Sequence, residues 1–178
     1  MHDGLYCRAA LGAGHLHART ENGSTIDGWG FSPEVWLGGS PVAGLALGGT
    51  VALLAVGDPD AAITAADSGG LGDVSGEARG VATYSSFGVF ADYYPMPRAG
   101  FHVMAGLNFS SLEFTPTGGQ ASEPATGVGV FGGAGYEWWA SDQWSVGPLV
   151  RVHWASLSDA GGATHILSPV FMLGVTNH

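Results

Sequence analysis

Residues 144–154 read WSVGPLVRVHW, and this stretch decides the fold class. In an extended chain the even positions form one face, which carries Trp, Val, Pro, Val, Val and Trp. The opposite face carries Ser145, Gly147, Leu149, Arg151 and His153. Because side chains alternate between the two faces of a strand, this pattern predicts a strand with one bulky apolar face and one mixed face of small and polar residues.

Seven further segments show a period of two. Together with 144–157, the predicted strands cover residues 4–17, 31–39, 45–56, 81–94, 101–114, 126–139 and 165–177, of which 31–39 has the weakest pattern. Strands of about 9–14 residues are long enough to cross a bilayer at a tilt. Pro148 and Pro169 lack the N–H that a sheet ladder needs, so we expect a bulge or a gap in pairing at each.

The connectors alternate between short and long. The short ones are 40–44, 95–99 and 140–143, and the long ones are 18–30, 57–80, 115–125 and 158–164. Outer-membrane barrels combine short periplasmic turns with longer outer loops. An even number of strands then leaves both termini on the periplasmic side.

The composition also favours a membrane barrel. Charged residues make up only 11% of the chain, hydrophobic residues make up 46%, and 31 residues are glycine. No apolar run approaches the roughly 18–20 residues of a membrane helix. We therefore predict an all-β chain whose single domain, residues 1–178, is a closed eight-stranded antiparallel up-and-down transmembrane β-barrel. A net charge of −10 argues against a nucleic-acid partner, and Cys7, the single cysteine, excludes an internal disulfide.

A water-soluble, lipocalin-like barrel that binds a ligand is the alternative with the same periodicity. The two differ in which face meets water. Here the bulky face carries Leu, Phe, Val and Trp, while the other face is rich in glycine. A glycine-rich surface would give a soluble protein little solubility, whereas glycine inside a narrow barrel makes room for large side chains from facing strands.

In these strands and connectors the chain resembles the small eight-stranded outer-membrane barrels of the OmpA/OmpX/OmpW-like group. The resemblance implies a Gram-negative outer-membrane location with periplasmic termini, contact with the lipid bilayer and lipopolysaccharide, and folding by the barrel-assembly machinery. Members favour an aromatic last residue, whereas this chain ends Val175-Thr176-Asn177-His178. Residues 1–3 do not begin a secretory signal, so we expect a mature form, and we expect a monomer without a cofactor.

Ionisable residues on the inward faces predict a polar network in the lumen. Its members are Arg8, Asp92, Glu137, Arg151, His102 and His153, with Asn108 on the same faces. Charges inside a narrow barrel are costly unless they are paired, so we expect Arg8 and Arg151 to pair with Asp92 and Glu137. The network either fills and orders the lumen or forms a gate for ions or protons.

Aromatic residues gather beside the short connectors. Tyr93, Tyr94, Phe101, Trp138, Trp139 and Trp144 predict an aromatic girdle at one membrane interface. The alternative is that these side chains pack the hairpins.

Three histidines are the candidate ligands for a transition metal. His15 and His17 project from one face of the first strand, and His165 lies near them if the first and last strands pair. The simpler interpretation is three interfacial histidines without a shared ligand, so we expect no metal.

We find no convincing catalytic triad. His153 and Ser156 fall on opposite faces of a strand, and His102 and Ser110 lie roughly 26 Å apart along one. The leading hypothesis is therefore a non-catalytic integral membrane barrel that serves in envelope structure or as a narrow pore. A lipid-modifying outer-membrane enzyme and the soluble ligand-binding barrel remain as alternatives.

Overall fold

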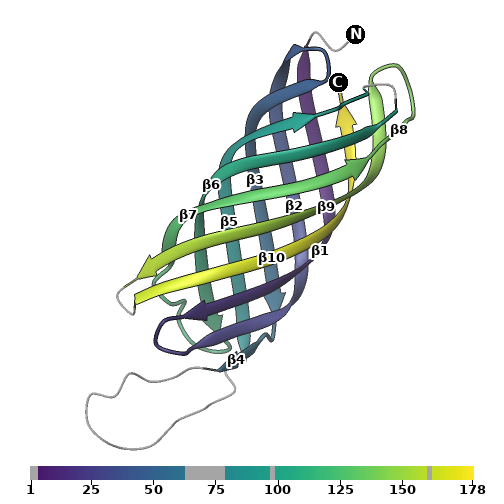
Figure 1. Ribbon diagram of the computed structural model, residues 1–178. Helices are drawn as coiled ribbons and strands as arrows, with labels where there is room; N and C mark the ends of the chain where they lie inside the picture. Colours follow the sequence, from purple (N-terminus) through teal and green to yellow (C-terminus); the bar gives the residue numbers. More distant parts are fainter. Residues whose placement is uncertain (1–3, 63–78, 97–98, 160–161) are drawn as a thin grey trace, which may run out of the picture.

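The computed structural model describes residues 4–62, 79–96, 99–159 and 162–178, which form a tilted cylinder of strands (Figure 1). The strands are β1 (Leu5–Thr20), β2 (Thr25–Val42), β3 (Leu45–Gly57), β4 (Asp60–Ala62), β5 (Gly80–Tyr93), β6 (Phe101–Pro116), β7 (Ala125–Tyr136), β8 (Trp138–Trp139), β9 (Trp144–Asp159) and β10 (Gly162–Asn177). Among these residues no helix is long and apolar enough to cross a membrane.

Eight long strands close the cylinder. Each pairs antiparallel with its sequence neighbours in the order β1-β10-β9-β7-β6-β5-β3-β2, and β1 pairs with both β10 and β2. The two short strands extend this wall, because β8 continues β7 along β9 and β4 lies against β2. The predicted fold class, a closed eight-stranded antiparallel up-and-down barrel, is confirmed.

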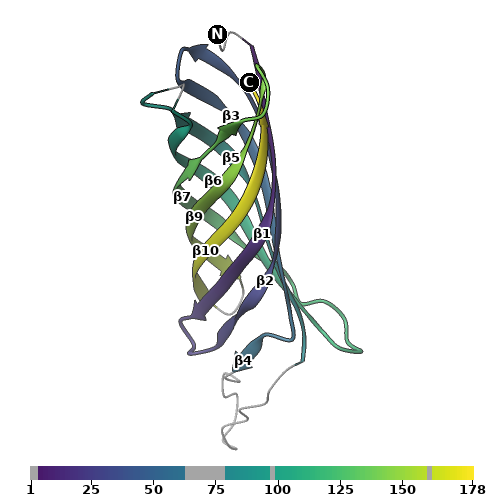
Figure 2. The same cartoon turned by 90° about the vertical axis from the view of Figure 1, so that its right-hand side faces the viewer.

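The start of β1 and the end of β10 share one end of the cylinder with the β2–β3, β5–β6 and β8–β9 connections, and β4 lies at the other end (Figures 1 and 2). We call these the terminal end and the loop end. At the loop end the predicted connectors are too long, because most of 18–30 and 158–164 is strand. The β1–β2 turn covers only residues 21–24. Residues 63–78, 97–98 and 160–161 of the predicted connectors lie outside the described residues.

Both strand prolines coincide with a gap in hydrogen-bonded pairing, as their missing N–H predicts. The β1–β10 ladder has no pair at Pro169 and resumes at Leu167. On β9 the ladder to β7 ends at Leu149 and the ladder to β8 begins at Val146, which leaves Pro148 unpaired on that side. On their other sides both prolines keep the regular β9–β10 register. The expected interruptions are therefore local and shift no register.

The outer wall carries a continuous apolar band. Outward positions are apolar or glycine from 144 to 154 on β9, from 101 to 109 on β6 and from 5 to 13 on β1, and the large ones are exposed. Towards the loop end the outward residues become polar, and they include Ser156 and Ser158, Ser111 and Glu113, and His15, His17 and Arg19. A band of about 9–11 residues per strand is the length that a tilted transmembrane strand requires. The outer wall thus matches the hydrocarbon core of a bilayer.

Beyond this band the polarity of the strands reverses. Inward side chains near the loop end form an apolar cluster. We call it the upper cluster, although the loop end is drawn at the bottom of Figure 1. It comprises Leu16, Ala18, Leu54, Val56, Ala82, Tyr84, Leu112, Ala125, Ala155, Leu157 and Ile166. On β1, β6 and β9 the outward neighbours at the same height are the polar residues named above. An apolar inside and a polar outside are typical of a barrel in water. The strands therefore continue past the membrane band as a water-facing extension.

We predict that Val150→Arg, near the middle of the band, lowers the free energy of unfolding by about 2–4 kcal/mol, because the guanidinium must enter hydrocarbon. Urea titration of the protein folded into lipid vesicles measures the change. Ser158→Arg is the matched control, because Ser158 lies on the same strand beyond the band, towards the loop end. It should lower the free energy of unfolding by at most about 1 kcal/mol. Equal effects of the two substitutions would contradict the placement of the band.

Candidate functional site

A buried ionic cluster occupies the lumen near the terminal end. Arg8 on β1 points inward, and its Nη2 lies 3.0 Å from Asp92 Oδ2 and 2.7 Å from Glu137 Oε1. Asp92 lies near the end of β5, and Glu137 lies between β7 and β8. None of the three side chains is more than 4% exposed. One guanidinium therefore bridges two carboxylates from opposite parts of the wall.

Hydroxyl groups complete the coordination of Glu137. Thr176 and Ser145 donate hydrogen bonds to its carboxylate at 2.6 and 2.7 Å, and Tyr94 donates one at 3.2 Å. The Tyr94 hydroxyl also accepts a hydrogen bond from Arg8 at 2.8 Å. Because each donor comes from a different strand or turn, the carboxylate ties four segments of the wall together.

Asp92 has its own partners. Tyr6 donates a hydrogen bond to Oδ2 at 2.8 Å, and His102 Nδ1 lies 2.8 Å from Oδ1. The His102 ring stacks on Tyr94, with the ring centroids 4.9 Å apart. Of the six predicted network residues, four thus meet in this one cluster: Arg8, Asp92, Glu137 and His102.

The predicted pairing of Arg151 is wrong. Both acids assigned by the sequence analysis, Asp92 and Glu137, contact Arg8, and Arg151 instead forms an ion pair with Glu34 on β2. Both partners of this second pair are almost completely buried. Among the described residues the lumen arginines therefore form two separate ionic groups: Arg8 with Asp92 and Glu137, and Arg151 with Glu34.

Trp36 lies close to the arginines of both ionic groups. Its ring centroid lies 5.6 Å from the guanidinium carbon of Arg8 and 5.4 Å from that of Arg151. The Arg151 guanidinium also lies 4.9 Å from the centre of the Phe131 ring. Arginine over an aromatic face is a favourable cation–π arrangement that partly replaces lost hydration. Trp36 Nε1 also donates a hydrogen bond to Glu34 at 3.1 Å.

Sequence reasoning missed Glu34 and Trp36, although a signal was present. Both lie in segment 31–39, where Phe31, Val35 and Leu37 face outward and the even positions face inward. The strand looked weak because its inward face alternates polar, charged, aromatic and glycine residues. Treating an acid on that face as a partner for a lumen arginine would have found Glu34.

A second polar layer lies on the loop side of Arg151. His153 Nδ1 lies 3.2 Å from Asn108 Nδ2, and the His153 ring stacks on Phe131 with the centroids 5.4 Å apart. Tyr84 and Ser110 share a hydrogen bond of 2.9 Å. His153 and Asn108 lie in the lumen as the sequence predicts, but they do not contact the cluster around Arg8.

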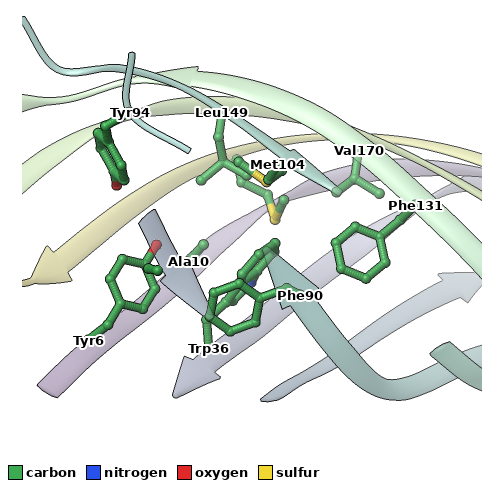
Figure 3. Packing of buried hydrophobic residues seen from close by; sticks show 11 residues of the cluster. Tyr6, Ala10, Trp36, Phe90, Tyr94, Met104, Phe131, Leu149 and Val170 are labelled. Atoms are coloured by element: carbon green, nitrogen blue, oxygen red, sulfur yellow. The ribbon is translucent and has the colours of Figure 1, made fainter. Parts of the chain in front are cut away.

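Apolar side chains fill the lumen around these polar groups. We call this group the lower cluster; it contains Tyr6, Ala10, Trp36, Ala46, Phe90, Tyr94, Met104, Phe131, Leu149, Val170 and Met172, none more than 5% exposed. Figure 3 shows the Tyr6, Trp36, Phe90 and Phe131 rings close together, with Met104 and Leu149 above them. The upper cluster then fills the lumen towards the loop end, with Leu16, Leu54 and Leu157 no more than 2% exposed. The interior is packed along most of its length.

The predicted girdle residues fall into two groups. Tyr93, Phe101, Trp138 and Trp144 are 43–57% exposed on the outer wall at the terminal end, where the prediction placed them. Tyr94 is a correction: it points into the lumen and is 5% exposed, because alternation sends it to the face opposite its neighbour. Trp139 is half-buried, with its ring 4.7 Å from that of His178.

The three outer histidines do not converge on a common point. Asp27 lies between two of them, with its carboxylate 2.9 Å from His15 Nε2 and 2.6 Å from His17 Nδ1. His165 lies opposite Arg19 and stacks on Trp154. In the part of the chain that the structure describes, no three His, Cys, Asp or Glu side chains could hold a metal ion.

Ser145, His178 and Glu137 meet at the terminal end in a grouping that contains the residue types of a hydrolytic triad. His178 Nε2 lies 3.1 Å from both the Ser145 hydroxyl and the Glu137 carboxylate. A triad needs the serine on one ring nitrogen and the acid on the other, because the proton passes through the ring. Here both partners contact the same nitrogen, and the serine donates directly to the acid. This geometry does not support nucleophilic catalysis.

Comparison with solved structures places this architecture among known barrels. The crystal structure of Neisserial surface protein A aligns with a TM-score of 0.60 at 16% identity, and the match covers 97% of this chain and 96% of that chain. The fold is that of a small outer-membrane barrel. OprG from Pseudomonas aeruginosa aligns at 0.55 with 12% identity over 99% of this chain and 96% of that one.

Ail, the attachment invasion locus protein of Yersinia pestis, aligns at 0.54 with 13% identity, and the match covers 98% of this chain and 99% of that chain. That structure holds the heparin analogue sucrose octasulfate. No family model matches the sequence, and no curated protein matches it. At these identities the likeness is one of fold.

We predict that Glu34→Gln lowers the free energy of unfolding by about 3–5 kcal/mol, because it leaves the Arg151 charge buried without its partner. The double variant Glu34→Leu with Arg151→Met removes both charges and should be less destabilised than the single one. Urea unfolding in lipid vesicles, followed by circular dichroism, compares them. A Glu34→Gln variant as stable as the parent would show that the pair is not buried.

Proposed function

We propose that this chain is an integral barrel of the bacterial outer membrane, without catalytic activity, whose closed lumen gives it a structural role in the envelope. The terminal end faces the periplasm in this proposal, and the loop end faces outward. The observation that carries the proposal is the packed interior, in which two apolar clusters and the two ionic groups of Arg8 and Arg151 occupy the lumen.

The outer wall supports a membrane location. Its apolar band contains exposed Leu, Val, Phe and Trp side chains in numbers that would aggregate in water. Aromatic residues such as Trp138 and Trp144 lie at the terminal edge of the band, where interfacial girdles occur in membrane proteins. The partners in this proposal are the lipid bilayer, lipopolysaccharide and, during biogenesis, the barrel-assembly machinery, with the protein acting as a monomer.

The lumen supports a closed barrel. An eight-stranded barrel is only wide enough for side chains to fill it. Trp36 and Arg8 are completely buried, and Arg151 is 1% exposed. Water therefore does not reach these three side chains, which a conducting path through the lumen would have to pass.

A gated pore is the second candidate, and the ionic cluster is the observation that favours it. Arg8 bridges Asp92 and Glu137, so a change at one acid removes one of the two ion pairs that the guanidinium makes with described acids. In this candidate, Glu137→Gln weakens the bridge and raises the open probability. In the structural candidate the same variant only loses stability.

We predict no steady single-channel conductance from the purified barrel in planar lipid bilayers. Combining Trp36→Ala with Phe90→Ala removes two central rings and should produce a small conductance, which shows that the assay detects an open lumen. Discrete steps from the unaltered protein that change with Glu137→Gln would contradict the closed barrel and favour the gate. Heat-modifiable migration on a gel serves as the check that each variant is folded.

We also predict that the folded barrel forms no product from phospholipid or lipid A, because the Ser145–His178–Glu137 grouping lacks the geometry of a triad. Mass spectrometry of the lipids after prolonged incubation measures this. Ser145→Ala is the matched variant. A product formed by the parent and absent with Ser145→Ala would overturn the non-catalytic assignment.

A further inference from the structure

The water-facing extension contains a cavity of about 220 Å³ at the loop end. Its large apolar lining residues are Ile26, Leu112 and Phe114, and its polar lining includes Thr20, Thr164 and Glu123. Neither the membrane band nor the closed lumen accounts for this cavity.

The walls of the cavity are held in place by hydrogen bonds. β4 pairs with β2 through Ile26 and Ala61, which fixes the short strand beside β2 at the loop end. Ser122 bonds twice to Phe114, with its N–H donating to the carbonyl at 2.9 Å and its hydroxyl accepting at 3.1 Å. A pocket with fixed walls loses little entropy when a ligand enters.

The cavity has a closed floor. Ala18, Leu112 and Ala125 belong both to its lining and to the upper cluster, in which Leu16 and Leu157 are completely buried. A molecule that enters from the loop end therefore meets packed side chains. This arrangement suits binding and not passage.

The dimensions and chemistry of the lining define the ligand. An apolar cavity of about 150 Å³ is large enough to bind benzene, so this one fits a six-membered ring with one short substituent. Thr20 and Thr164 share a hydrogen bond of 2.9 Å between their hydroxyls, and a hydroxyl can both donate and accept. Glu123 in the lining disfavours anions, as does the net charge of −10.

From these observations we propose that the loop-end cavity binds a compact uncharged molecule with an apolar ring-sized body and a single hydroxyl group. The body lies against Ile26, Leu112 and Phe114, and the hydroxyl group bonds to the threonine pair. This inference goes beyond the proposed function, because it concerns the extension. It holds whether or not the lumen within the membrane band conducts ions.

Isoleucine methyl groups provide a direct test. The chain has three isoleucines, of which Ile26 lines the cavity and Ile166 lies in the upper cluster. The protein, labelled at its isoleucine δ1-methyl groups and embedded in lipid nanodiscs, is titrated with benzyl alcohol. We expect a saturable shift of the Ile26 signal, which Ile26→Val assigns, and a smaller shift of Ile166. Benzoate, which has the same size and a negative charge, should give no saturable shift.

Filling the cavity supplies the specific control. Ala125→Leu places a larger side chain in the space, and the affinity for benzyl alcohol should fall at least about tenfold. Ala61→Leu fills the opposite wall and serves if the first variant does not fold. Ala105→Leu, on the exposed outer face of β6, is the matched substitution and should leave binding unchanged.

Three results would overturn the proposal. The first is an Ile26 signal that shifts linearly without saturation, as partitioning into lipid produces. The second is equal affinity for benzyl alcohol in the parent and in both filled variants. The third is a shift with benzoate as strong as that with benzyl alcohol, which would exclude the selection against anions. The conductance and lipid-product assays are separate measurements, so failure of this inference leaves the proposed function unaffected.

Discussion

The narrowness of an eight-stranded barrel is the constraint on which the rest of this structure depends. Every inward side chain must fit against those of the facing strands, since the cylinder has room for little else. Glycine solves this problem where a large group crosses the lumen. A Cβ atom at Gly106 would collide with the Phe131 ring, and one at Gly135 would collide with the His102 imidazole. The glycine content of the chain is therefore the counterpart of its large lumen residues.

The same narrowness explains how charge is tolerated inside. A buried guanidinium needs a carboxylate within reach, and in a cylinder this size the opposite wall is always within reach of an arginine. Arg8 and Arg151 each cross to acids on other strands, and Trp36 lies near both. Two ion pairs and one indole thus connect β1, β2, β5 and β9 through the lumen, in addition to the ladders of the wall.

The reversal of polarity along the strands divides the barrel into a part that faces lipid and a part that faces water. Within the band the apolar side faces lipid and the mixed side faces the lumen, and in the extension the apolar side turns inward. Strand pairing continues across the boundary, because β1 and β2 pair as far as Arg19 and Thr25. The extension therefore has an apolar core of its own, and the loop-end cavity is the part of that core which side chains do not fill.

The sequence by itself determined the number of long strands, their order and the side that faces lipid, because a period of two reports the two faces of each strand locally. It also placed Arg8, Asp92, Glu137 and Arg151 inside, and it located the interruptions at Pro148 and Pro169. The sequence misjudged the loop-end connectors. The alternation continues there with the polar residues outward and the apolar residues inward, so residues 18–30 resemble a loop. Only the tertiary structure decided that Arg151 pairs with Glu34, that Tyr94 belongs to the lumen and that the outer histidines stay apart. Those contacts depend on which strands face each other across the cylinder and at what height, and that geometry follows from closure and register, which no single strand encodes.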